Sequence, residues 1–107
     1  MPSPSEPPRR TEYRELRLCS GGAGLEALPS RSVVLDLTRV REALELEGVP
    51  IIDARVVLIV SLAVETTISR SGRLLFKTRD LDAARSALAR LQPLLDRSAL
   101  STGGGGR

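Results

Sequence analysis

Residues 54–78, ARVVLIVSLAVETTISRSGRLLFKT, constrain the fold more than any other part of the chain. β-Branched and aliphatic residues crowd this stretch, and such residues favour strands. The run from Val56 to Val60 is almost continuously apolar, which is typical of a central strand covered on much of both faces. A second strand is expected over 63–69 and a third over 74–77, joined at Ser71-Gly72, a pair suited to a tight hairpin turn. The stretch therefore predicts three consecutive strands in an antiparallel meander.

An amphipathic helix is expected on each side of this meander. The first spans 36–48, with Asp36 as its N-cap and Gly48 as the residue that stops it. The second spans 80–95, is capped by Asp80, and is expected to end or kink at Pro93. Both stretches carry apolar residues at helical spacing, so each predicts a helix with one face buried against the sheet.

A short apolar alternation at 16–18 indicates a further edge strand, followed by a glycine-rich loop. The resulting order is (β)-α-β-β-β-α. We predict an α+β two-layer sandwich, with a small antiparallel sheet of three to four strands and two helices on one face. Residues 14–97 form this single domain. A disordered N-terminal arm over 1–13 precedes it, and a flexible Gly-rich tail over 98–107 follows it.

Composition excludes several kinds of chemistry. The chain has 107 residues, a net charge of +3, a single cysteine and no histidine. Without histidine it lacks the usual general base and the usual metal ligand, so we expect no catalytic residues, no metal and no cofactor. Its carboxylates occur where helix caps and surface charges belong. The longest apolar run is too short to cross a bilayer, and the single cysteine suits a reducing cytoplasm.

Two features could still carry function. Cys19 lies in the segment CSGGAG, which lacks the G-K-[ST] sequence of a phosphate-binding loop, and with no histidine in the chain it is a weak candidate thiol nucleophile. The hairpin also carries a basic set: Arg70, Arg73, Lys77 and Arg79. Arg73 and Lys77 lie four residues apart on one expected strand and so share a face. These four cations are the predicted partner-binding residues, although a solvated sheet rim would show the same pattern.

The segments LRLCSGGAGLEALP, LDLTRVREALELEGVP and the run from residue 54 to 91 together resemble a known domain. It is the small C-terminal domain appended to ThiF/MoeB/HesA-type adenylyltransferases, which activate sulfur carriers and ubiquitin-like proteins. The best matching residues are Leu18, Cys19, Pro29, Gly72, Arg73, Lys77, Thr78, Asp80, Ala84 and Arg85. Ser20 and the SRSGR turn depart from that pattern, and the adenylating domain is missing. The resemblance implies a non-enzymatic accessory module that docks an activating enzyme or a β-grasp carrier.

The alternative is a small basic nucleic-acid-associated module. The last hairpin and helix resemble half of a TATA-binding-protein repeat, and the layer order is similar to the dimerising subunit of the KEOPS complex. Such DNA saddles wedge aromatic or apolar side chains between bases, and the chain has only one Phe and one Tyr. We also expect that a sheet this small can complete itself by pairing an edge with a second copy.

Overall fold

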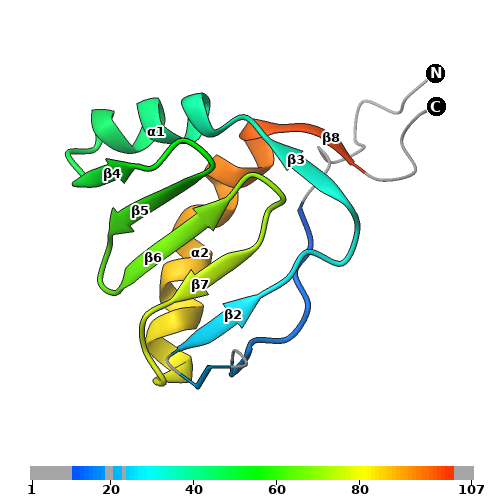
Figure 1. The fold of residues 1–107 in the computed structure, drawn as a ribbon, viewed down its shortest axis with the longest axis vertical. Helices are drawn as coiled ribbons and strands as arrows, with labels where there is room; N and C mark the ends of the chain where they lie inside the picture. Colours follow the sequence, from blue (N-terminus) through cyan, green and yellow to red (C-terminus); the bar gives the residue numbers. More distant parts are fainter. Residues whose placement is uncertain (1–10, 19–20, 23, 103–107) are drawn as a thin grey trace.

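The predicted meander is the centre of the fold in a computed structural model, which describes residues 11–18, 21–22 and 24–102. Its strands are β5 (Val57–Ser61), β6 (Glu65–Ser69) and β7 (Leu74–Phe76), each antiparallel to the next. Three further strands extend the meander on both sides: β1 (Arg17–Leu18), β2 (Leu25–Ala27) and β4 (Ile51–Asp53). The result, here called the large sheet, has six strands in the order β1-β2-β7-β6-β5-β4 (Figure 1). The expected count of three to four strands was too low.

A separate two-stranded sheet joins β3 (Val33–Leu35) to β8 (Ala99–Thr102) in antiparallel register. The C-terminal tail was predicted to be flexible from residue 98 onward. Residues 99–102 instead form β8, while 103–107 lie outside the described residues. The prediction failed because β8 is held by β3, a partner from the other end of the chain, and local composition carries no sign of that pairing.

Both predicted helices form, with the predicted caps. α1 spans Leu37–Leu46, and the Asp36 side chain accepts hydrogen bonds from the backbone N–H groups of Thr38 (3.1 Å) and Arg39 (3.3 Å). α2 spans Leu81–Ser98, and Asp80 caps it by accepting from the N–H groups of Asp82 (3.0 Å) and Ala83 (3.3 Å). Gly48 follows α1 at φ +76°, as expected of a residue that stops a helix.

Pro93 does not end α2, which continues to Ser98. Proline removes one helical hydrogen bond, and its ring crowds the preceding turn. Here the ring is exposed, whereas Leu94 and Leu95 beyond it are buried in the core. Burial of those two leucines stabilises the last turn more than the missing bond weakens it, so tertiary packing overrides the local signal.

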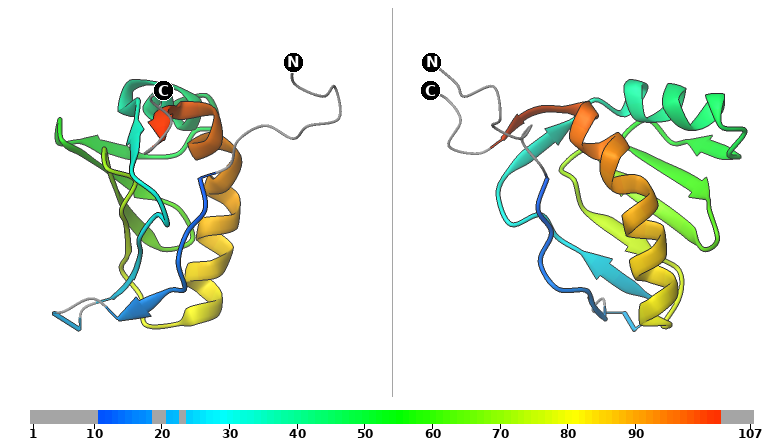
Figure 2. Two further views of the ribbon diagram at one scale, coloured as in Figure 1. Left: turned by 90° about the vertical axis from the view of Figure 1, so that its right-hand side faces the viewer. Right: turned by 180° about the vertical axis from the view of Figure 1, so that it is seen from behind.

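One core lies between the helices and one face of the large sheet. The sheet contributes Leu58, Val60, Ile68, Leu74 and Phe76, all at most 1% exposed. The helices contribute Val40, Leu44, Ala84, Leu91 and Leu95, all at 0% exposure. α2 crosses this face of the sheet, and α1 packs on β4, β5 and α2 (Figures 1 and 2). The two-layer α+β architecture is confirmed.

The predicted N-terminal arm ends earlier than expected. Residues 1–10 lie outside the described residues, but 11–13 are part of the domain. The Thr11 N–H donates to Asp96 Oδ1 (2.7 Å), and the Gln92 side-chain amide donates to the Thr11 carbonyl (2.6 Å). Tyr13 forms an antiparallel bridge with Pro29. The polar composition of residues 11–13 predicts disorder, because it carries no sign of their hydrogen-bond partners on α2 and near Pro29.

Candidate functional site

The strands of the large sheet send alternate side chains to its two faces. The face opposite the core carries a cross-strand row that follows from the register: Ile52, Ile59, Thr67, Leu75, Glu26 and Arg17. α2 lies on the other side of the sheet, and no helix covers this row (Figure 2). A central strand covered on both faces was expected at 56–60, and that expectation was wrong for the outward-facing Val57 and Ile59.

Apolar side chains dominate the middle of this uncovered face. Ile52 is 64% exposed, and Val57, Ile59 and Leu75 are partly buried without packing against the core. We call the group formed by Ile52, Val57, Ile59, Thr67 and Leu75 the outer face. Apolar surface that a fold leaves contiguous and uncovered marks a place where another molecule can dock.

Ion pairs border the outer face. Arg73 donates to Glu26 Oε1 from Nε (3.2 Å) and Nη2 (3.0 Å), and Arg17 Nε donates to Glu26 Oε2 (3.3 Å). The Arg73 hydrogen bonds, and then those of Arg17, hold the pKa of the Glu26 carboxyl below its ordinary value. Lys77 Nζ lies 3.8 Å from Glu65 Oε2. The positive charge of these strands is therefore largely neutralised by neighbouring carboxylates.

The four predicted binding cations do not form one cluster. Arg73 and Lys77 share the face of β7 that the spacing predicted, but both are paired with carboxylates. Arg70 lies in the turn before β7 and Arg79 in the loop after it, both exposed and neither in an ion pair with a described residue. Whether any of the four binds a partner stays a prediction.

The predicted Ser71-Gly72 turn is present, as a three-residue loop of Arg70, Ser71 and Gly72. Gly72 is buried at φ +89°, and a Cβ there would overlap the Val33 side chain. The Tyr13 hydroxyl donates to the Gly72 carbonyl (2.7 Å), and burial, followed by the charge of Asp96, raises the pKa of Tyr13. The turn is thus a packing element that joins the N-terminal segment, β3 and the large sheet.

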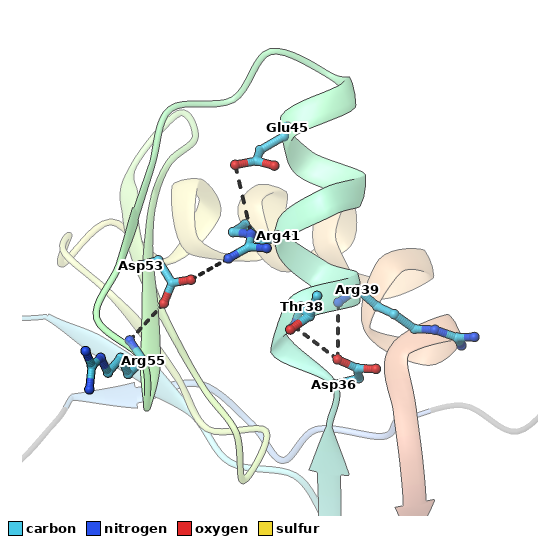
Figure 3. A network of polar contacts seen from close by, with 7 residues as sticks. All are labelled: Asp36, Thr38, Arg39, Arg41, Glu45, Asp53 and Arg55. Atoms are coloured by element: carbon cyan, nitrogen blue, oxygen red, sulfur yellow. Dashed lines mark hydrogen bonds and ion pairs between the residues drawn. The ribbon is translucent and has the colours of Figure 1, made fainter.

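A polar network ties α1 to the edge strand β4 (Figure 3). Arg41 donates to Asp53 Oδ2 (2.7 Å) and lies 4.0 Å from Glu45, one helical turn further along α1. The Arg55 backbone N–H donates to Asp53 Oδ1 (2.8 Å), and this bond, then Arg41, lowers the pKa of Asp53. Both Asp53 oxygens are occupied, so Asp53 has a structural role and is not a candidate acid or base.

Two shallow hollows occur in the described part of the molecule. One lies beside β1 and is lined by Arg14, Glu15, Leu16, Arg17, Glu26 and Leu28. The other lies along α2 and is lined by Arg85, Leu88, Ala89, Gln92, Pro93 and Asp96. Neither lining contains a hydroxyl or thiol, and within residues 11–18, 21–22 and 24–102 no group of three His, Cys, Asp or Glu could hold a metal ion. Cys19 lies outside the described residues, so its reactivity stays a prediction.

These features define a small two-layer α+β domain with one uncovered, partly apolar sheet face. No helix among the described residues is long and apolar enough to cross a membrane. No family model, no curated protein and no solved structure matches the chain.

Proposed function

We propose that this protein is a non-catalytic interaction module that docks a protein partner on its outer face. The observation that carries the proposal is the uncovered row of Ile52, Ile59 and Leu75 on a sheet whose opposite face already holds the complete core. Within the fold these side chains have cross-strand neighbours but no helix of the described residues over them, and Ile52 remains 64% exposed. Their burial against a partner would contribute roughly 25 cal/mol for each Å² removed from solvent.

The surroundings of the outer face favour a protein partner over a nucleic acid. Its nearest cations are already engaged in ion pairs with Glu26 and Glu65, which makes them less available to a phosphate backbone. The two aromatic side chains lie elsewhere, because Phe76 is fully buried and Tyr13 packs against the hairpin turn. Base stacking therefore has no platform on this face.

The resemblance to the domain appended to ThiF/MoeB/HesA-type adenylyltransferases supports a particular class of partner. On that basis we propose an activating enzyme, or the β-grasp carrier it modifies, as the molecule that docks. The resemblance rests on the hairpin, the Asp80 cap and the early Ala84-Arg85 of the second helix. The class of partner and the position of the docking face are independent claims, and each can fail without the other.

The test is affinity capture from source cells with the wild-type chain and with Leu75→Asp. We expect the wild type to recover an adenylyltransferase or a β-grasp protein, and Leu75→Asp to lose it. The matched control is Leu46→Asp, since Leu46 is 90% exposed at the end of α1 and lies outside the outer face. Equal capture by wild type and Leu75→Asp would rule out the outer face. Capture of unrelated partners only would rule out the family assignment.

Nucleic-acid binding and homodimer formation are tested by separate measurements. A mobility-shift assay at low salt tests the nucleic-acid alternative, which requires binding that weakens steeply as salt rises.

Light scattering coupled to size exclusion tests a homodimer formed through a sheet edge. The edges of the large sheet are β1, of two residues, and β4, which packs beside α1. A monomer at working concentration would leave the outer face to a different protein.

A further inference from the structure

Two turns of the meander lie at the same end of the large sheet, because successive antiparallel strands reverse direction. One turn joins β4 to β5 and contains Arg55 and Val56, and the other joins β6 to β7 and contains Arg70. The register of β5 and β6 ends with Val57 opposite Ser69. Val56 and Arg70 lie just beyond that pair, in turns at the same end of the sheet. We call Arg55, Val56 and Arg70 the arginine end.

Both arginines of this end are available to a ligand. The Arg55 backbone is held by Asp53, while its guanidinium points away from Asp53 and α1 (Figure 3). Asp53 is saturated by Arg41 and by the Arg55 N–H. Arg70 uses its carbonyl to accept from Leu35 N–H (2.8 Å), which leaves its side chain exposed. Among the described residues, no carboxylate forms an ion pair with either arginine.

An exposed apolar side chain belongs to the same end of the sheet. Val56 is 72% exposed, and its neighbour Val57 belongs to the outer face. Arg55 has φ +74° and is the single described non-glycine residue with positive φ, a backbone conformation that glycine adopts far more readily. The β4–β5 turn therefore has an arginine at a position where backbone conformation would favour glycine.

We infer that the arginine end binds an acidic protein segment, with carboxylates on Arg55 and Arg70 and an apolar side chain over Val56. Guanidinium groups pair with carboxylates in bidentate geometry, and such bonds are stronger than neutral ones. A nucleic-acid strand fits less well, because an exposed valine offers nothing to a phosphate backbone. The inference rests on the proposed function and names the chemistry of its partner.

The experiment measures binding of the full chain to a labelled synthetic peptide of Glu and Asp with a central Leu-Ile pair. Fluorescence anisotropy gives the affinity, and a peptide with Lys in place of the acidic residues is the charge control. Arg55→Gly is expected to weaken binding roughly tenfold or more, since a charge-assisted pair is lost. Its thermal midpoint is expected to equal or exceed that of the wild type, because glycine relieves the positive φ. Loss of binding then cannot be attributed to unfolding.

Arg85→Ala is the matched control, since Arg85 is also exposed and without an ion pair to a described residue, but lies in the first turns of α2, which follows β7 at the opposite end of the sheet. It is expected to bind the peptide as the wild type does, whereas Arg70→Ala should weaken binding. No peptide binding at low salt, equal weakening by Arg55→Gly and Arg85→Ala, or tighter binding of an oligonucleotide would each overturn the inference. If Leu75→Asp abolishes partner capture while Arg55→Gly leaves capture and peptide affinity unchanged, this inference fails and the proposed function survives.

Discussion

The two faces of the large sheet are formed by the same strands, but only one of them packs against the helices. On β7, Phe76 points into the core and is fully buried, whereas its neighbour Leu75 is partly buried on the outer face. Every inner-face residue must fit the helices that cover it, because protein interiors are close-packed. No described element packs against Leu75. The inner face therefore carries the stability of the fold, and the outer face is left for a partner.

The largest effect is expected from Phe76→Ala. Removing the one phenylalanine of the core leaves a cavity beneath α2, and such truncations cost about 3–5 kcal/mol of unfolding free energy. Urea denaturation measures the loss, and Leu75→Ala is the control, expected to cost less than about 1.5 kcal/mol because its side chain is only partly buried and lies outside the core cluster. Similar losses for both variants would contradict the division between the faces.

Gly72→Ala tests the turn between β6 and β7, where Gly72 packs against Val33 of β3. A methyl group there would overlap the Val33 side chain and would occupy a backbone position at φ +89°. Together, overpacking and the left-handed backbone should cost about 2–4 kcal/mol. Gly22→Ala is the control, since Gly22 has φ +71° with nothing within 4 Å, and it should show the backbone cost alone. Equal losses at the two positions would show that Val33 can move aside.

Leu75→Asp sharpens the comparison further, because it changes the outer face by a full charge. Its expected cost in unfolding free energy is about 1–2 kcal/mol, because Leu75 is partly buried and the new carboxylate would lie opposite Glu26. Partner capture should nevertheless be lost. Thermal denaturation and capture must be measured on the same preparation, and a large drop in the melting midpoint would place Leu75 in the core after all.

The smallest effect is expected from Glu26→Gln, and it depends on pH. The pKa of Glu26 is lowered in the folded state by Arg73 and Arg17, so its contribution to stability is fully present above the ordinary glutamate value of about 4.3. That contribution is lost as pH falls through the folded pKa. The melting midpoints of wild type and Glu26→Gln should therefore converge as the solution becomes acidic. Parallel curves down to low pH would show that the pair with Arg73 contributes nothing to folding.

Much of the fold could be predicted because its signals are local. Asp36 and Asp80 cap their helices through groups two and three residues away, and the meander follows from period-two patterning and a Ser-Gly turn. Strands β2, β3 and β8 could not be predicted. Each is short, and each exists because a distant segment supplies its hydrogen-bond partners.

The candidate site divides in the same way. Period-two spacing correctly put Arg73 and Lys77 on one face, but it could not reveal that Glu26 neutralises Arg73 from 47 residues away. The exposed turn at Arg55 and Val56 was not predicted, because nothing in the local sequence indicates a positive φ at an arginine. A Cys19 nucleophile and the binding roles of Arg70 and Arg79 stay predictions.

The sequence by itself determined the three strands of the meander, the two helices with their N-caps, the hairpin turn and the lack of histidine. These depend on propensities and hydrogen bonds within a few residues of one another. Only the tertiary structure decided which face of the sheet is covered, which cations are neutralised, and which turns meet at the arginine end. Those properties depend on packing between segments that are far apart in the chain, and α2 can bury only one face of the sheet.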